Sequence, residues 1–201
     1  MTICARPAPL SPFGPIAALV LSLVLPIAAA AEAPAAPYTL SLSDDRSRVD
    51  LQGFIDFGIT RALTELVETE PGIRILRLQS PGGRVAEARG LVTVVKRFDL
   101  ATRAQGDCAS ACTMVFIAGQ ERALEPGARL GFHGYDLRSP VFGLLDPEVE
   151  MARDSAIFLE AGVDAGFMAR AMAIPPRAMW FPTRPQLIAA GVIDGPRIGS
   201  P

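Results

Sequence analysis

The sequence has few histidine and lysine side chains, which often transfer protons or bind charged groups. Its 201 residues include one histidine, His133, and one lysine, Lys96. Basic and acidic residues nearly balance, at 19 against 21, and the net charge is −2. A protein that grips nucleic acid needs a basic surface, so this composition excludes nucleic acid as a partner. No internal repeat is visible, and a chain of this length fits one domain.

The sequence also lacks an apolar run long enough to favour a membrane-spanning helix. Its longest run, Ile16–Ala31, contains Ser22 and Pro26, whereas a spanning helix needs about 20 apolar residues. Arg6 precedes the run, and small residues end it, an arrangement typical of an export signal. We therefore predict a signal peptide over residues 1–31, cleaved after Ala31, and a periplasmic or secreted protein. An uncleaved membrane anchor is the alternative.

Cysteine is scarce as well, with three in the whole chain. Cys4 would leave with the signal peptide, so Cys108 and Cys112 would remain, in a compartment that favours disulfides. A zinc site needs more ligands than two thiols and His133, and we predict no metal. A separation of four residues suits a disulfide poorly within one helix, but Cys108 precedes the predicted helix. The sequence leaves two interpretations of Cys108 and Cys112 open: a disulfide between them, or two buried free thiols.

Hydrophobic patterning predicts strands alternating with helices. Residues 32–47 form a tether that leads into an edge strand, and residues 48–201 form one domain. Alternation of this kind favours an α/β fold with a mainly parallel sheet flanked by helices and a helical C-terminal part. The predicted strands cover Tyr38–Leu42, Val49–Gln52, Ile73–Leu78, Ala101–Gln105, Arg122–Leu124 and Arg129–His133, and the C-terminal helices Pro147–Glu160, Asp164–Ala173 and Pro185–Ala190.

Two segments have the character of an acyl-transfer site. Gly82 and Gly83 follow a predicted strand, and backbone amides without side chains in front of them can bind an oxyanion. Ser110 lies between small residues at the predicted start of an apolar helix, where the helix dipole favours negative charge. A plain strand-to-helix turn and an N-cap serine are the structural alternatives.

His133 is the available partner base for Ser110. Imidazole accepts and releases protons near neutral pH, and for this reason histidine usually activates a serine nucleophile. A structural histidine at a strand end is the alternative. Lys96 is a poor base for Ser110, because it lies 13 residues beyond Gly83 on the polar side of a helix.

Together, these residues resemble the Clp protease proteolytic subunit, within the Clp/crotonase superfamily. The resemblance is carried by Ser80–Gly83, Ser110, Ala118–Gly119 and His133, in this order. It implies a fold of repeated β-β-α units and a serine peptidase-like hydrolase with Ser110 as the nucleophile. It further implies His133 as the base and the amides of Gly83 and Ala111 as the oxyanion donors.

The same resemblance indicates the partners. It implies peptide or unfolded protein substrates, no cofactor and assembly as a homo-oligomer. Because no ATP is expected outside the cytoplasm, we expect no ATP-driven unfoldase to feed an exported member. A crotonase-type enzyme acting on coenzyme A esters is a weaker interpretation, since it needs neither the serine nor the histidine and its cofactor belongs in the cytoplasm.

One position departs from the family pattern. The third catalytic residue of the family is an aspartate, and its place corresponds to Met179 here. Loss of this carboxylate costs a serine hydrolase on the order of 10⁴ in turnover. Asp136 and Asp146 are the next acids after His133, but both also suit a loop or a helix cap. A catalytically weak or inactive Clp-like peptide-binding or scaffold module is therefore the alternative function.

The export signal is directly testable. We expect N-terminal sequencing of the exported protein to begin at Glu32, because signal peptidase cleaves after a small-residue motif such as Ala29–Ala31. Recovery of residues 1–31 on the exported protein would instead indicate a membrane anchor.

Overall fold

The computed structural model describes residues 37–135 and 146–195. The predicted signal peptide, residues 32–36 of the tether and Asp136 lie outside the described residues. Within the described ranges, no helix is long and apolar enough to cross a membrane.

Strands and helices alternate along the described chain. The strands are β1 (Tyr38–Leu42), β2 (Arg48–Gly53), β3 (Ile75–Ser80), β4 (Ala101–Ala109), β5 (Arg122–Leu124) and β6 (Arg129–Gly131). The helices are α1 (Ile59–Thr69), α2 (Val85–Arg97), α3 (Ala111–Ile117), α4 (Pro147–Glu160), α5 (Ala165–Met172) and α6 (Arg184–Ala189).

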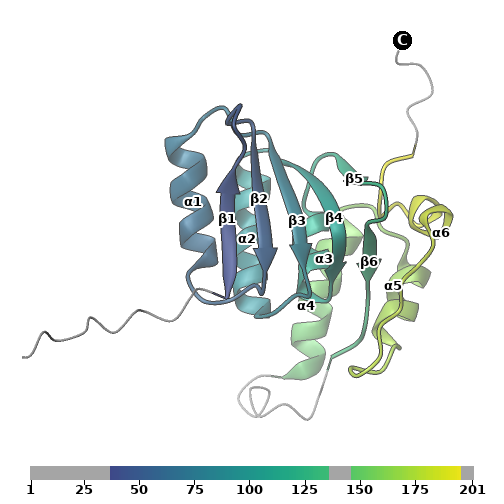
Figure 1. Cartoon of the computed structure of the whole chain (residues 1–201). Coiled ribbons are helices and arrows are strands. Elements are labelled where there is room, and N and C mark those ends of the chain that lie inside the picture. The colour runs from purple at the N-terminus through teal and green to yellow at the C-terminus, as the bar shows by residue number, and fades with distance from the viewer. Residues whose placement is uncertain (1–36, 136–145, 196–201) are drawn as a thin grey trace, which may run out of the picture. The chain divides into compact units, whose positions relative to one another are not determined.

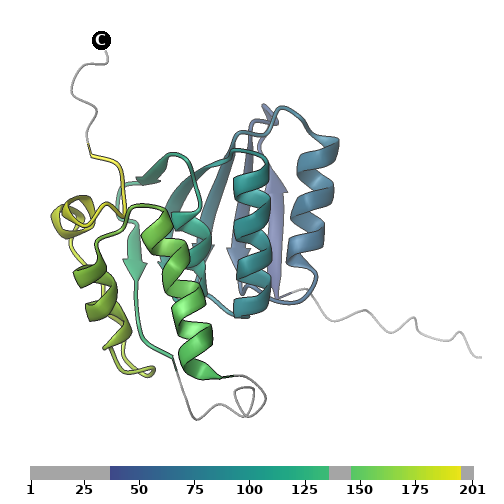
Figure 2. The same ribbon diagram turned by 180° about the vertical axis from the view of Figure 1, so that it is seen from behind.

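In the described part of the chain, all the strands join one mostly parallel sheet, whose order is β1-β2-β3-β4-β5, with β6 also on β4. Only the β1–β2 pair at the edge is antiparallel. Figures 1 and 2 show α1, α2 and α4 against one face of this sheet, and α5 and α6 beyond β6. The mixed α/β fold with a mainly parallel, helix-flanked sheet is therefore as predicted.

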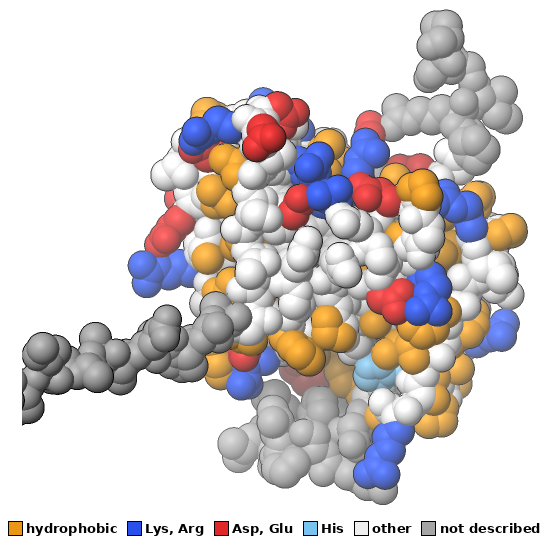
Figure 3. Space-filling model, viewed as in Figure 1, with side chains coloured by type: hydrophobic (Ala, Val, Ile, Leu, Met, Phe, Trp, Pro, Cys, Tyr) orange, Lys and Arg blue, Asp and Glu red, His pale blue; other side chains and the backbone are white. Residues whose placement is uncertain are grey.

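The core lies between the sheet and the helices because the strands alternate in polarity. Val49 and Leu51 of β2 and Leu76 and Leu78 of β3 are fully buried, on the side of the helices. The residues between them, such as Arg77, point to the other face. Figure 3 shows that face, with few hydrophobic side chains in its middle and charged side chains gathered along its upper edge. A single hydrophobic core thus lies between one face of the sheet and the helices.

A bulge in β4 prepares the site. Leu78 of β3 pairs with Ala104, but Ser80 pairs with Cys108, so β4 has two extra residues between these pairs. Gly106 lies in this segment with φ +71°, a conformation that glycine adopts readily. The strand predicted to end at Gln105 therefore continues to Ala109, because the extra residues are accommodated within the strand.

The bulge divides β4 between two neighbours. Residues 102–104 pair with β5, whereas residues 107–109 pair with β6. The last residues of β3, β4 and β6 therefore lie side by side, at the carboxyl edge of the sheet. Ligand sites of open parallel sheets form at this edge. The chain segments that follow Ser80, Ala109 and Gly131 all begin there.

Candidate active site

Ser110 forms a sharp turn between β4 and α3. Its backbone has φ 55° and ψ −129°, a conformation that non-glycine residues rarely adopt. Its amide donates to the carbonyl of Gly131 at 2.9 Å, and its carbonyl accepts from the amide of Thr113 at 2.9 Å. A strained serine on a strand-to-helix turn exposes its hydroxyl above the sheet edge, as nucleophiles of hydrolases do.

The glycine loop packs directly on this turn. A Cβ atom on Gly82 would lie 2.8 Å from the Cβ of Ser110 and 2.7 Å from the carbonyl oxygen of Ala109. A Cβ atom on Gly83 would lie 2.1 Å from the carbonyl oxygen of Ile55. Only glycine fits at both positions, and the loop that follows β3 is therefore held close to Ser110.

Two backbone amides beside Ser110 are free to bind an anion. The amides of Gly83 and Ala111 donate no hydrogen bond to any described residue, and both residues line a cavity that also contains Ser110. Ala111 is the first residue of α3, whose amides have no partner within the helix. The arrangement places the two predicted oxyanion donors at the predicted nucleophile.

His133 contacts Ser110 directly. Its Nε2 lies 2.7 Å from the Oγ of Ser110, and its Nδ1 lies 2.6 Å from the carbonyl oxygen of Gly134. A carbonyl can only accept a hydrogen bond, so Nδ1 carries the proton of the neutral ring. Nε2 then accepts a hydrogen bond from the Ser110 hydroxyl. A general base requires this tautomer, in which Nδ1 carries the proton and Nε2 is free to accept one.

The chain around His133 is fixed by a second segment. Phe132 and Trp180 exchange backbone hydrogen bonds of 2.8 and 2.9 Å, and the amide of Gly134 donates to the carbonyl of Ile174 at 2.8 Å. Phe132 also makes edge-on contacts with the rings of Phe158 and Phe167. These bonds hold the imidazole over the end of β6.

No described carboxylate is hydrogen-bonded or ion-paired to His133. The antiparallel Phe132–Trp180 bridge places Met179 opposite His133, in the position where the resemblance expects an aspartate. Met179 is 38 % exposed. Asp146 instead caps α4, since its side chain accepts from the amide of Glu148. The acceptor for Nδ1 is a main-chain carbonyl.

A cavity of about 270 Å³ adjoins Ser110 and His133. Its wall is mostly apolar, but it includes Tyr135 and the carboxylate of Asp154. The lining residues are Gly83, Val85, Ser110, Ala111, Thr113, Met114, Phe132, His133, Gly134, Tyr135, Asp154, Phe158 and Met172. A largely apolar hollow next to a nucleophile suits an uncharged side chain of a substrate.

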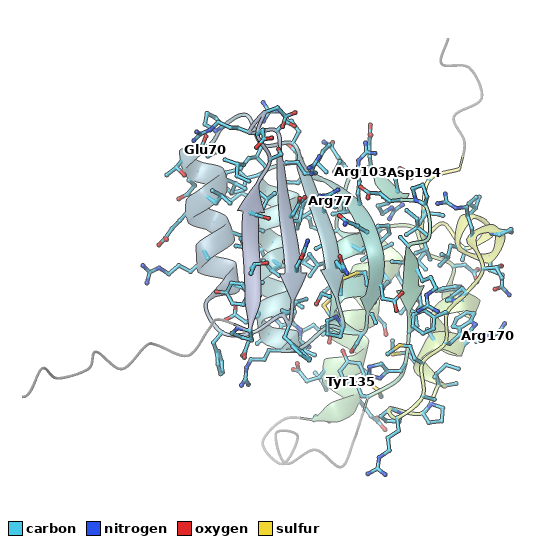
Figure 4. The ribbon with its side chains drawn as sticks, viewed as in Figure 1. Glu70, Arg77, Arg103, Tyr135, Arg170 and Asp194 are labelled. Carbon is cyan, nitrogen blue, oxygen red and sulfur yellow. A yellow bond between two sulfur atoms is a disulfide. The ribbon has the colours of Figure 1, made fainter. Side chains whose placement is uncertain are left out.

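A largely buried polar network adjoins the cavity. The Tyr135 hydroxyl donates to Oδ2 of Asp154, and the Arg89 Nε lies 2.5 Å from Oδ1 of Asp154. Arg89 also pairs with Glu150. Tyr135 follows β6 and lies beside α4 (Figure 4), so the network joins the His133 segment to α2 and α4.

The network favours fixed protonation states. Burial raises the pKa of Tyr135 far above its ordinary value, and the bond to Asp154 adds to this rise. The phenol therefore stays protonated and donates. Burial alone would lower the pKa of Arg89, but the hydrogen bonds with Asp154 and Glu150 outweigh it and raise the pKa above its usual range.

Cys108 and Cys112 form a disulfide across the Ser110 turn. Their sulfur atoms are bonded, and their Cα atoms lie 5.3 Å apart. Cys108 belongs to β4 and Cys112 is the second residue of α3, so the bridge does not lie within one helix. Both cysteines are fully buried. The bridge thus encloses the strained serine in a short covalent ring.

The remaining predicted candidates lie elsewhere. Lys96 is on α2 and pairs with Glu160 of α4 at 3.3 Å, and it lines a groove that contains neither Ser110 nor His133. Across residues 37–135 and 146–195, no group of three or more His, Cys, Asp or Glu side chains is arranged to hold a metal ion.

Sequence reasoning missed four contributors to the site: Gly134, Tyr135, Arg89 and Asp154. Asp154 had a detectable signal, because it falls four residues before the buried Phe158, on the inner side of a predicted helix. An acidic side chain on the buried side of a helix must have a charged or hydrogen-bonding partner. The role of the Gly134 carbonyl has no signal in the sequence, since every residue carries the same group.

No protein-family model and no curated protein sequence matches this chain. Among solved structures, a ClpP1 point mutant from Listeria monocytogenes is similar, with a TM-score of 0.59 and 16 % sequence identity. The match covers 74 % of this chain and 90 % of that chain.

The fold is ClpP-like. At 16 % identity the likeness extends to the fold alone. The match therefore supports the sheet-and-helix architecture predicted from the resemblance, whereas the roles of individual residues rest on the geometry described above.

The disulfide yields a clear expectation for chemical modification. When the exported protein is unfolded without reductant and alkylated, we expect Cys108 and Cys112 to be protected, because bonded sulfurs do not alkylate. Reduction before alkylation should release both, as peptide mass spectrometry would show. Modification of Cys108 and Cys112 without reductant would contradict the bridge.

Proposed function

We propose that this protein is an exported serine hydrolase, peptidase-like in its chemistry. Ser110 is the nucleophile, His133 the general base, and the amides of Gly83 and Ala111 bind the oxyanion. The observation that carries the proposal is the hydrogen bond between the Ser110 Oγ and the His133 Nε2, at 2.7 Å, with Nδ1 held by a carbonyl. Nucleophile, base and orienting acceptor are thus in contact, as hydrolysis through an acyl-enzyme requires.

The proposed reaction follows from these contacts. His133 takes the Ser110 proton as Oγ attacks a substrate carbonyl, and the negative charge moves to the carbonyl oxygen between the two amides. His133 then gives its proton to the leaving group, and water hydrolyses the acyl-enzyme by the reverse transfer. The largely apolar cavity holds the side chain next to the scissile bond.

The proposed substrates are short peptides or already unfolded proteins, because no ATP-driven unfoldase is expected outside the cytoplasm. The buried disulfide favours an oxidising compartment and so supports export. Membership of the Clp/crotonase superfamily, its repeated β-β-α units and a homo-oligomeric assembly belong to the same proposal, and the ClpP-like fold supports them.

A Clp-like peptide-binding or scaffold module is the second candidate function. Met179 favours it, because no described carboxylate stabilises the imidazolium that forms during catalysis. The two functions share the cavity and differ in whether Ser110 is activated.

An activity-based probe separates them. We expect a fluorophosphonate to modify the folded protein at Ser110, since the base raises the nucleophilicity of the hydroxyl and the amides hold the phosphonyl oxygen. Ser110→Ala and His133→Ala should reduce labelling to background, as intact-protein mass spectrometry would measure. Ser43→Ala, which changes a half-buried serine between β1 and β2, is the matched control and should label at the wild-type rate.

Two results would count against the hydrolase. A folded wild type that stays unlabelled at pH 7 to 9 supports the binding module. Labelling that His133→Ala leaves unchanged would show that Ser110 reacts only through its helix position, and that His133 is structural.

Met179→Asp tests the missing carboxylate. The variant places a charge opposite His133, where it stabilises the imidazolium, so we expect the labelling rate to rise by about tenfold or more. Met179→Asn introduces a side chain of nearly the same shape as aspartate but without its charge, so the labelling rate should not rise. An unchanged rate in Met179→Asp would mean that residue 179 does not reach the imidazole.

A further inference from the structure

We propose that Tyr135 and Asp154 are positioning residues that hold the Gly134 carbonyl against His133. They would supply, through the backbone, the orientation that a third catalytic side chain supplies in a triad. This inference rests on the proposed function, in which His133 is the base.

The acceptor for Nδ1 belongs to the peptide bond between Gly134 and Tyr135. The carbonyl of Gly134 and the amide nitrogen of Tyr135 belong to one planar peptide unit, so a restraint on Tyr135 is also a restraint on that carbonyl. On the other side, the amide of Gly134 is fixed by the carbonyl of Ile174. The Tyr135 hydroxyl bound to Asp154 supplies the second fixed point.

Gly134 needs such a restraint. A Cβ atom at this position would lie 2.2 Å from the carbonyl oxygen of Met172, so the close approach of the two chains demands glycine. Glycine also leaves its own carbonyl freer to rotate than any other residue does. Without an anchor on the following residue, the acceptor for Nδ1 would sample other orientations.

The anchor itself is rigid. Asp154 is 1 % exposed, and its other oxygen lies 2.5 Å from the Nε of Arg89. Arg89 pairs in turn with Glu150, one turn earlier on α4. The Tyr135 hydroxyl is therefore tied to two helices of the core layer rather than to a mobile side chain.

The chemistry of the network supports a functional role. A buried carboxylate paired with a half-buried guanidinium is costly, and an apolar cluster would often serve stability as well or better. Tyr135 and Asp154 line the cavity, and Tyr135 is two residues from His133. A pair of charges retained at this point is explained by the orientation that it imposes on the neighbouring backbone.

The test uses Tyr135→Phe, which removes the hydroxyl and keeps the ring. Tyr38→Phe is the matched control, because Tyr38 is the other of the two tyrosines and lies on the edge strand β1. Since the chain has one histidine, a protein produced without a histidine tag gives the imidazole nitrogen signals of His133 alone in a ¹⁵N NMR spectrum.

The tautomer of His133 is the first readout. When the ¹⁵N signals show a neutral ring, we expect the wild type and Tyr38→Phe to carry the proton on Nδ1. In Tyr135→Phe, the Gly134 carbonyl is released, so a second tautomer with the proton on Nε2 should become populated. A purely structural role of the hydroxyl would change stability and leave the tautomer as it is.

The rate of labelling is the second readout. In Tyr135→Phe, the fluorophosphonate should bind with unchanged affinity, while the rate constant of the bond-forming step falls about tenfold. Asp154→Asn should act through the same hydrogen bond between Tyr135 and Asp154. The variant that combines Tyr135→Phe with Asp154→Asn should therefore label no more slowly than the slower of the two single variants. Should Asp154→Asn fail to fold, Tyr135→Phe decides alone.

The outcomes separate the two proposals. Wild-type tautomer and wild-type labelling rate in Tyr135→Phe would overturn the positioning role and leave the hydrolase intact. A wild type that never labels would contradict the hydrolase, and the NMR comparison would still decide whether Tyr135 orients His133.

Discussion

The site depends on the pairing of the last residues of β4 with two neighbours at once. Ser80 of β3 pairs with Cys108 on one side, and Leu130 of β6 pairs with it on the other. Parallel strands bring their carboxyl ends to one edge, so the glycine loop, the serine turn and the histidine segment all start within a few residues of the same place. The bulge around Gly106 makes this possible, because it turns the end of β4 from β5 to β6.

A carbonyl in the place of a carboxylate separates two roles that one side chain usually combines. As an acceptor, the Gly134 oxygen selects the tautomer of His133 as a carboxylate does. As a neutral dipole, it stabilises the imidazolium less than a full negative charge does. The proposed enzyme would therefore keep the geometry of a triad and lose part of its electrostatic stabilisation, which suits slow turnover.

Most of the architecture could be predicted from local patterns. β1 and β5 have the predicted bounds, as does α4, whose start is marked by Asp146 before Pro147. The predicted strand ends were wrong where backbone geometry decides them. β4 continues past Gln105 through a bulge at Gly106, and β6 ends at Gly131 rather than His133. The serine, histidine and glycine loop were identifiable by residue type. The contact of His133 with its own neighbour's carbonyl was not, because side-chain chemistry does not encode it.

The orienting acceptor of His133 belongs to the main chain, and this affects how such a site can change. No replacement of a side chain deletes the carbonyl of residue 134, so a scan of the protein by alanine would reach this third partner only indirectly, through the residues that hold the backbone in place. Substitution can reach that partner only by displacing the backbone, as a side chain at Gly134 would do against Met172. An orienting group of this kind is shielded from direct loss by mutation, although it depends on every neighbour that keeps the chain in place.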